Sequence, residues 1–263
     1  MKHWIYPNWP APSSIGACMT TRSGGCSVGP YGAYTGLGGL NLGGHTGDDD
    51  HAVVDNRKII QQYIPEEPIW LEQVHSDQVL ELPLAAQDLT TQNPIADAVV
   101  TQHPETVCAI LTADCLPVLF CDHMGRAVGA AHAGWRGLCA GVIEKTVQAH
   151  RRLAGCSAQQ QMAWLGPAIG RTQFEVGQEV FDAFVAAALP DEQPMTLSAF
   201  APLSDKYFCD LYQLARIRLR RVQITQIYSA PLCTFSHPEH FYSYRRDRVT
   251  GRMVSMIWLR KPH

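Results

Sequence analysis

The sequence lacks several features that would assign it to a class at once. It has no run of about 20 apolar residues, so we expect no transmembrane helix. Residues 1–12 show no charged-then-apolar signal pattern, which predicts a cytoplasmic protein. Neither sign of charge dominates, because 21 basic residues face 24 acidic ones. A nucleic acid or an anionic membrane is therefore not an expected partner.

Common cofactor and metal motifs are missing as well. The chain contains no G-x-G-x-x-G, no Walker A sequence, no H-E-x-x-H and no C-x-x-C, so dinucleotide-binding enzymes, P-loop ATPases and zinc fingers lose support. Gly25–Gly29 matches G-x-S-x-G, but the glycines and proline after it predict a loop instead of the helix that follows a nucleophile elbow. Nine cysteines, an odd number without dense clustering, predict mostly reduced thiols.

What remains is the composition of a folded protein, with 46% hydrophobic and 17% charged residues. Short apolar runs predict buried strands, and amphipathic segments predict helices. A hairpin with Gly251 in its turn is predicted at 241–259. Because strands and helices alternate without a flexible linker, we expect one mixed α/β domain over 1–263. The predicted strands are 69–75, 97–101, 107–114, 117–122 and 127–132, and the predicted helices are 48–64, 137–153, 174–189 and 208–222.

Three apolar runs stop at a residue that can bind a metal or act as a nucleophile: His75, Cys115 and His132. Buried strands that end at reactive side chains often build a site, because strand ends are rigid and share an edge. One thiolate and two imidazoles are the three ligands that a catalytic zinc uses while its fourth position stays open. Iron or copper accept the same ligands. The alternative is that each residue is a buried thiol or a core histidine.

Candidate substrate-binding residues lie in three other segments. Arg136 stands where a strand passes into a helix, and a helix N-terminus with a guanidinium suits phosphate or carboxylate. Its alternative is a surface arginine beside glycines that only permit tight packing. Arg245 lies beside two tyrosines whose rings can stack on a planar ligand, or else on an exposed hairpin. Arg22, Asn41 and His45 lie in a Gly-rich stretch that can close over a substrate.

Seven segments, spread from about Ala17 to Trp258, carry a family pattern. They read NLGGHTGD, WLEQVHSDQV, CAILTADCLPVLFC, AAHAGWRGLCAGVIE, WLGPAIG, FEVGQEV and FYSYRRDRVTGRM. In these segments the chain resembles the bacterial YfiH/YlmD family, also called the laccase-domain or multicopper polyphenol oxidoreductase family. The resemblance implies that His75, Cys115 and His132 bind one zinc. It also implies a four-layer α/β/β/α sandwich.

The resemblance further implies a zinc-dependent purine nucleoside phosphorylase that also deaminates adenosine and cleaves methylthioadenosine. Its partners would be a purine nucleoside and phosphate, held near Arg136 and Arg245, and the oligomeric state stays open. The laccase name implies a copper enzyme that oxidises polyphenols, but three ligands are too few for a multicopper oxidase. Some members are linked to editing of peptidoglycan precursors. The alternative is therefore a metal-free hydrolase with Cys115 as nucleophile and His75 or His132 as its base.

Overall fold

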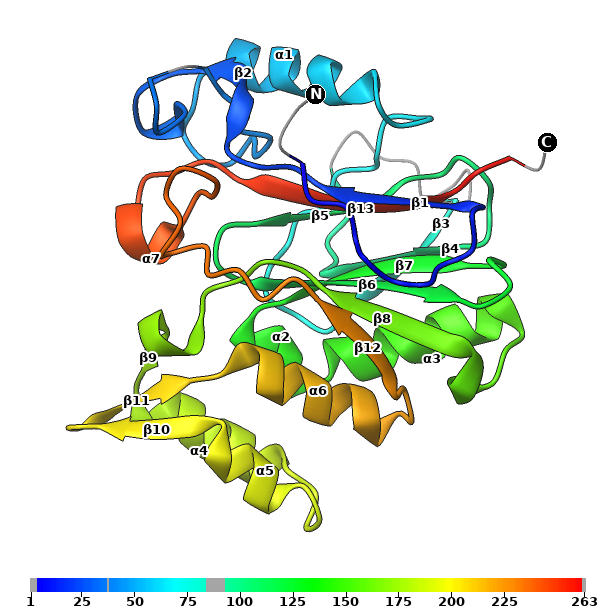
Figure 1. Ribbon diagram of the computed structural model, residues 1–263, viewed down its shortest axis with the longest axis vertical. Coiled ribbons are helices and arrows are strands. Elements are labelled where there is room, and N and C mark those ends of the chain that lie inside the picture. The colour runs from blue at the N-terminus through cyan, green and yellow to red at the C-terminus, as the bar shows by residue number, and fades with distance from the viewer. Residues whose placement is uncertain (1–3, 37, 84–92, 262–263) are drawn as a thin grey trace.

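The structure is a computed structural model that describes residues 4–36, 38–83 and 93–261. Two β-sheets lie face to face at its centre, with helices on both outer sides (Figure 1). The predicted four-layer α/β/β/α arrangement is therefore confirmed. The layers outside the sheets are helix α1 (Asp50–Gln61) on the smaller sheet and helices α2 (Trp135–Ala140), α3 (Val142–Ala154) and α6 (Leu211–Arg221) on the larger one.

The smaller sheet is antiparallel and joins segments that are far apart in the sequence. Its central strand pairs Ile257 with Ala17 on one side and Ser255 with Ile110 on the other. Ile60 of α1 is buried in the cluster of apolar side chains on the outer face of this sheet. In spatial order the strands are β1 (Ile15–Met19), β13 (Met253–Leu259) and β5 (Cys108–Thr112).

The larger sheet has central strands in which every residue is buried. Continuous apolar runs of this kind fit strands that are covered on both faces. β6 and β7 are antiparallel neighbours that pair Val118 with Ala131, whereas the two outer pairs of strands are parallel. In spatial order the strands are β12 (Gln226–Ser229), β8 (Gln161–Leu165), β6 (Leu116–Asp122), β7 (Val128–Ala133), β4 (Ala98–Thr101) and β3 (Val79–Leu82).

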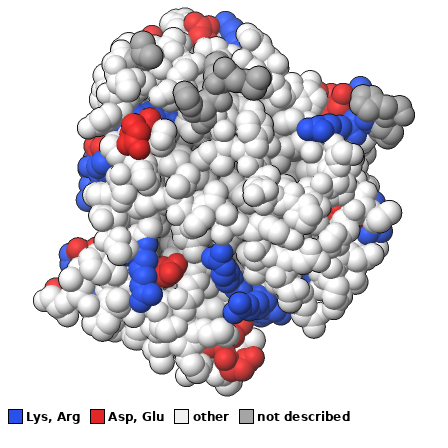
Figure 2. Space-filling model, in the orientation of Figure 1, with Lys and Arg blue, Asp and Glu red and all other residues white. Residues whose placement is uncertain are grey.

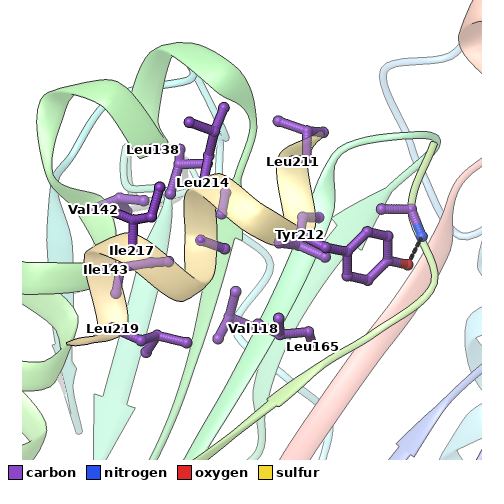
Figure 3. Packing of buried hydrophobic residues seen from close by; sticks show 14 of the residues in the cluster. Val118, Leu138, Val142, Ile143, Leu165, Leu211, Tyr212, Leu214, Ile217 and Leu219 are labelled. Carbon is purple, nitrogen blue, oxygen red and sulfur yellow. Dashed lines mark hydrogen bonds between the residues drawn. The ribbon is translucent and has the colours of Figure 1, made fainter. Parts of the chain in front are cut away.

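Helix α6 shows how the outer helices pack on the larger sheet (Figure 3). Leu214 and Ile217 are buried beside Leu138 and Val142 of the neighbouring helices. Burial of one such aliphatic side chain stabilises a fold by about 1.5–3 kcal/mol. At the start of the helix, the Tyr212 hydroxyl accepts a hydrogen bond of 3.0 Å from the backbone amide of Ala168. The helix is thereby tied to the segment that follows β8.

The remaining elements lie around this sandwich. A third sheet, with two helices beside it, extends from the larger sheet below α6 in Figure 1. Its parts are β10 (Phe200–Leu203), β11 (Lys206–Cys209) and β9 (Glu175–Val176), with α4 (Gln178–Ala187) and α5 (Gln193–Ser198). The other elements are β2 (Ser23–Ser27), α7 (Tyr244–Asp247) and the 3-10 turns η1 (Gly29–Tyr31), η3 (Ala158–Gln160) and η4 (Arg171–Gln173).

Two predicted helices are right in place but differ in extent. The predicted helix at 137–153 is two helices, because Gly141 has a φ of 104° that ends α2 and starts α3. The predicted helix at 174–189 begins only at Gln178, since the residues before it form β9 and pair with β11. In both cases a tertiary or backbone feature interrupts an apolar pattern that looks continuous in sequence.

The two other predicted helices are confirmed with shorter bounds. The acidic start of 48–64 fits α1, where the Asp49 side chain accepts a hydrogen bond from the amide of His51. The stripe at 208–222 is helical only from the residue after Asp210, whose side chain caps α6. The residues before the cap belong to β11.

Four of the predicted strands are confirmed, whereas the predicted strand at 69–75 and the predicted hairpin at 241–259 are wrong. The predicted hairpin at 241–259 does not form, because 244–247 is helical and the following strand pairs with β1 and β5 instead. Residues 69–75 are irregular apart from a single bridge between Glu72 and Ile95. The confirmed predictions are 97–101, 107–114, 117–122 and 127–132, which correspond to β4, β5, β6 and β7.

The cysteines, the surface charges and the helix lengths agree with the composition of the chain. All nine cysteines are free thiols, as predicted. The face in Figure 2 carries separate basic and acidic groups instead of one continuous charged patch. Within the described ranges, no helix is both long and apolar enough to cross a bilayer.

Candidate metal centre and its cleft

The three predicted donor residues meet at one point. The donor atoms of His75, Cys115 and His132, called here the His–Cys–His group, all lie within 4.8 Å of one another. The Cys115 sulfur is 3.8 Å from Nε2 of His75. The two imidazole rings stand at 72° to each other, with centroids 4.8 Å apart. Among the residues that the structure describes, this is the one group of its kind.

Strand pairing brings two of these donors together. His132 lies near the end of β7 and pairs with Pro117 at the start of β6. Cys115 is the residue directly before β6, in the short connection from β5 that passes from the smaller sheet to the larger one. The antiparallel register therefore places a strand end beside a strand start. The expectation that these two donors share a sheet edge is met.

His75 reaches the group by a different route, because it does not end a strand. Its backbone has a φ of 62°, a left-handed conformation that costs a non-glycine residue roughly 1–2 kcal/mol. The Asp97 carboxylate stabilises that conformation, since it accepts hydrogen bonds from three consecutive backbone amides, those of Val74, His75 and Ser76, at 3.2, 3.0 and 2.6 Å. A carboxylate at the start of β4 thus fixes the loop that carries one donor.

The same carboxylate also orients a second donor. Asp97 Oδ1 lies 2.8 Å from Nδ1 of His132, and both side chains are buried. Because an ionised carboxylate only accepts, His132 donates through Nδ1 and its Nε2 is left for the His–Cys–His group. The backbone adds to the fit, since the Asp97 carbonyl accepts from the His132 amide at 2.7 Å. Sequence reasoning missed Asp97. An aspartate directly before a buried strand was the available signal, because a buried carboxylate requires hydrogen-bond donors from nearby residues.

Gly134 leaves the space in which the group assembles. A Cβ atom at this position would lie 2.8 Å from Cδ2 of His75 and 3.1 Å from the Cys115 sulfur. The first contact is shorter than real Cβ atoms show, so a side chain here would push the two donors apart. The backbone of Gly134 has φ −63° and ψ 156°, which any residue adopts. Space, and not conformational freedom, therefore favours glycine here.

The electrostatics of the group favour a thiolate. Burial alone raises the pKa of the Cys115 thiol, but the imidazoles of His132 and His75 outweigh it and lower that pKa to about 6. The pKa of Asp97 is lowered to about 2, because hydrogen bonds from His132 and Ser76 overcome the cost of its burial. The anionic sulfur of Cys115 and the anionic carboxylate of Asp97 therefore lie on either side of the His132 imidazole.

Asp114, the neighbour of Cys115, has a structural role. Its carboxylate accepts from the Arg245 backbone amide at 2.7 Å and from the hydroxyls of Thr234 and Ser243 at 2.6 and 3.0 Å. These contacts hold the start of α7 against the donor group.

Two pockets open on the His–Cys–His group and share His75, Cys115 and Arg136 as walls. We call the larger one, of about 440 Å³, the arginine pocket, and the smaller one, of about 220 Å³, the aromatic pocket. The arginine pocket is further lined by His45, Gln73, His132, Tyr244 and Arg252. The aromatic pocket is further lined by Trp135, Ile169, Phe174, Leu211, Tyr244 and Arg245.

The predicted substrate-binding residues divide into two sets. His45 lines the arginine pocket, Arg245 lines the aromatic pocket, and Arg136 lines both. Arg22 and Asn41 are buried and line neither pocket. Their side chains instead hold the Gly-rich stretch in place.

The bonds of Arg22 and Asn41 show that structural role. The Arg22 Nε donates to the carbonyl of Gly32 at 2.8 Å, and the Asn41 side chain bonds to the amide of Arg252 and the hydroxyl of Thr46. Arg252, which lines the arginine pocket, is a residue that sequence reasoning missed. No local pattern distinguishes it from the other basic residues near the C-terminal end of the sequence.

The donor set fits a single metal ion. Around one zinc the protein ligands stand roughly 3.5 Å apart, given bonds of about 2.0–2.3 Å in tetrahedral geometry. The 3.8 Å between the Cys115 sulfur and Nε2 of His75 is close to that spacing. His132 is held by a carboxylate in the manner usual for metal-bound imidazoles. The open side of the group faces the two pockets.

The fold and the site define a mixed α/β protein with a three-donor group where its two sheets are joined. Residues 16–260 match the multi-copper polyphenol oxidoreductase laccase family, and the chain belongs to that family. It is 47% identical to "Purine nucleoside phosphorylase YfiH" of Escherichia coli strain K12, over 98% of this chain and 100% of that protein. It is 45% identical to a purine nucleoside phosphorylase of Pseudomonas aeruginosa, over 98% and 99% of the two chains.

Solved structures agree with this assignment. A Neisseria meningitidis protein superposes with a TM-score of 0.87 at 43% identity, covering 99% of this chain and 100% of that one. YlmD from Geobacillus stearothermophilus superposes with a TM-score of 0.86 at 31% identity, covering 98% and 96%. The family resemblance read from the sequence is therefore confirmed, together with the fold that it implied.

Proposed function

We propose that the protein is a zinc-dependent purine nucleoside phosphorylase, with His75, Cys115 and His132 as the ligands of one zinc ion. The observation that carries the proposal is the convergence of these three donors at the junction of two pockets. One is lined by Arg136 and Arg252, and the other adds aromatic side chains to Arg136 and Arg245. The names of the full-length relatives support the reaction class. A purine nucleoside and phosphate are the substrates.

The proposed reaction exchanges one bond at the anomeric carbon of the ribose. An oxygen of phosphate forms a bond to C1′ while the bond from C1′ to N9 breaks. The electron pair of that bond leaves with the purine, which takes up a proton, so the products are ribose 1-phosphate and the free base. The arginines at the cleft hold the phosphate and its charge in line with the breaking bond. When bound, zinc supplies a Lewis acid that polarises an oxygen of a ligand in the cleft.

The test is a product assay on the metal-loaded protein with inosine and phosphate. We expect hypoxanthine and ribose 1-phosphate in equal amounts, with no hypoxanthine when phosphate is left out. Cys115→Ala and His132→Ala are expected to lose zinc and activity together. If Cys115→Ala protein keeps the full rate, the metal site has no part in the reaction. Adenosine and methylthioadenosine, assayed alongside, test the wider substrate range, and inosine formed from adenosine tests deamination.

The oxidase activity in the family's name has less support from the site. A multicopper oxidase needs several metal centres with many histidines close together. The described part of the chain holds one group of three such ligands. A phosphorylase needs only that one centre, with a cleft for two substrates.

A second candidate function has one specific observation in its favour. Cys115, His132 and Asp97 follow one another in space as nucleophile, base and orienting carboxylate do in cysteine hydrolases. Such an enzyme would attack an acyl or amide bond, for example in a peptidoglycan precursor, without a metal. Chelation distinguishes the two candidates: a phosphorylase loses activity with its zinc, whereas a cysteine hydrolase keeps activity and forms a covalent adduct on Cys115.

A further inference from the structure

The two pockets differ in chemistry, and we propose that they divide the substrates between them. In this arrangement the aromatic pocket binds the purine base, and the arginine pocket binds phosphate through Arg136 and Arg252. The inference rests on the proposed phosphorylase function and adds the place of each substrate to it. It also moves the phosphate away from Arg245, which the sequence had suggested as a phosphate ligand.

The arginine pocket has the electrostatics of an anion site. None of its lining residues is a carboxylate. Arg252 is half-buried, and its guanidinium donates to the carbonyls of Thr250 and Gly251, both at 3.0 Å. Among the described residues, no carboxylate lies within ion-pair distance of this guanidinium. A cation that is partly removed from water and not paired with a carboxylate favours an anionic ligand.

Two further groups complete that site. Arg136 is exposed and lies over the Trp135 ring at 4.4 Å, and within the described ranges it too lacks a carboxylate partner. Partial burial lowers the pKa of His45, and the nearby Arg252 and Arg57 lower it further. A neutral imidazole can donate one hydrogen bond without adding charge. Two guanidinium forks and one such donor match the several oxygens of phosphate.

The aromatic pocket is lined by side chains that suit a flat ring. Its walls include Trp135 and the buried side chains of Ile169, Phe174 and Leu211. Stacking of a base on an aromatic side chain contributes about 1–3 kcal/mol. The one carboxylate in this pocket belongs to Asp114, whose oxygens already accept three hydrogen bonds. The pocket therefore offers faces for stacking and little negative charge.

Arg245 belongs to the base side of the cleft. Its guanidinium lies 5.2 Å from the centre of the Phe174 ring, and its Nη1 donates to the carbonyl of Glu175 at 2.8 Å. The remaining N–H groups can reach the edge of a base in that pocket, and the N7 and O6 atoms of a 6-oxopurine are acceptors that suit arginine. The ribose then lies between the pockets, beside Cys115 and His75, which both pockets share.

The phosphate half is tested with Arg252→Met and Arg136→Met in the metal-loaded enzyme. We expect each variant to raise the KM for phosphate roughly 10- to 100-fold, as the loss of a charged hydrogen bond does. In Arg252→Met the inhibition constant of hypoxanthine should stay unchanged, because Arg252, unlike Arg136, does not line the aromatic pocket. Arg152→Met is the matched control, because Arg152 is exposed on α3 and pairs with Glu81 instead of lining the cleft. Arg252→Lys is expected to recover part of the phosphate affinity.

The base half is tested with Phe174→Leu, which removes the aromatic face at nearly constant volume. We expect the inhibition constant of hypoxanthine to rise roughly 10-fold while the KM for phosphate is unchanged. Phe181→Leu is the matched control, because Phe181 stacks on Tyr207 at 4.5 Å and lines neither pocket. The melting temperature and zinc content of every variant show whether the fold and the metal centre remain.

The opposite pattern overturns the inference. If Phe174→Leu weakens phosphate and Arg252→Met weakens hypoxanthine, the assignment of the pockets is reversed and wrong. If wild-type protein cleaves no nucleoside, the phosphorylase function fails, and direct titration of hypoxanthine and of inorganic phosphate by calorimetry still tests the two pockets. Binding of neither ligand to the zinc-loaded wild type would also reject the inference.

Discussion

Asp97 Oδ1 stands 2.8 Å from Nδ1 of His132, and the same carboxylate accepts the backbone amide of His75 at 3.0 Å. One side chain therefore fixes two of the three donors, one through its ring and the other through its backbone. The two donors are 57 positions apart in the chain, as the difference between their numbers shows (132 − 75), so no local interaction could set their separation. The geometry of the proposed metal site depends on this shared carboxylate.

The first prediction concerns Asp97→Asn. The asparagine amide cannot accept at both oxygen positions, so both the His132 ring and the loop of His75 lose a partner. We expect zinc affinity to fall about 10- to 100-fold, measured by competition with a chromogenic chelator. Asp122→Asn is the control, because the Asp122 carboxylate also accepts backbone amides, those of Met124 and Arg126, but at the far end of β6. Equal zinc affinity in the two variants would show that Asp97 has no positioning role.

The second prediction concerns Gly134→Ala. The backbone angles of Gly134 suit alanine, so the fold should form, but the new methyl group would lie against His75 and Cys115. We expect purified protein with nearly unchanged circular dichroism and strongly reduced zinc content, measured by elemental analysis. Gly44→Ala is the control, because among the described residues the only atom within 4 Å of a Cβ there is Nη2 of Arg57, at 3.8 Å. Full zinc content in Gly134→Ala would show that the donors can move apart at little cost.

How far the sequence alone leads is clear from particular residues. Apolar runs predict β4 to β7, and the residues at the ends of those runs include Cys115 and His132. Both features can be recognised from the sequence, because they depend only on the order of apolar and reactive residues. The positive φ of His75 and the space left by Gly134 are not visible in this way. They arise from contacts between strands whose register the sequence does not state.

The same limit explains why the hairpin prediction is wrong and why two candidate residues lie outside the pockets. The hairpin at 241–259 has a reasonable local pattern, but β13 gains two partner strands in the smaller sheet and the hairpin would give it only one. Arg22 and Asn41 look like candidates for a closing loop, yet both are buried. Their polar atoms bond to other parts of the chain, such as the carbonyl of Gly32 and the amide of Arg252. Polar residues in a Gly-rich stretch indicate hydrogen bonding, and only coordinates show whether the partner is the chain or a ligand.

The third prediction concerns thiol reactivity in metal-free protein. The neighbouring imidazoles lower the pKa of Cys115 to about 6, against the effect of its burial, whereas burial raises the pKa of the exposed Cys26. At pH 7 iodoacetamide should therefore modify Cys115 before any other cysteine, as measured by mass spectrometry of peptides. Zinc added beforehand should protect it. Cys26→Ser serves as control, and faster modification of Cys26 than of Cys115 would contradict the assigned thiolate.

The last prediction concerns His150, a buried histidine of α3 far from the proposed chemistry. Its Nε2 lies 3.0 Å from the carbonyl of Ala127, and its Nδ1 accepts from the Gln161 side chain at 2.8 Å, so both ring nitrogens are used by the neutral form. Burial lowers the pKa of His150 to about 4; Asp122 opposes that shift and Arg126 adds to it.

Folding therefore keeps His150 neutral at a pH where the unfolded chain is already protonated. As the pH falls through the ordinary pKa of about 6.5, the unfolded state binds the extra proton and stability is lost, until the folded state also protonates near pH 4. Between pH 7 and pH 5 the loss is about 2 kcal/mol. His150→Gln removes this titration, so its free energy of unfolding, measured with urea at both pH values, should fall by about 2 kcal/mol less than that of the wild type. Equal losses in the two proteins would mean that His150 takes up its proton without cost in the folded state, and the neutral ring with two fixed partners would be the wrong description of this part of the core.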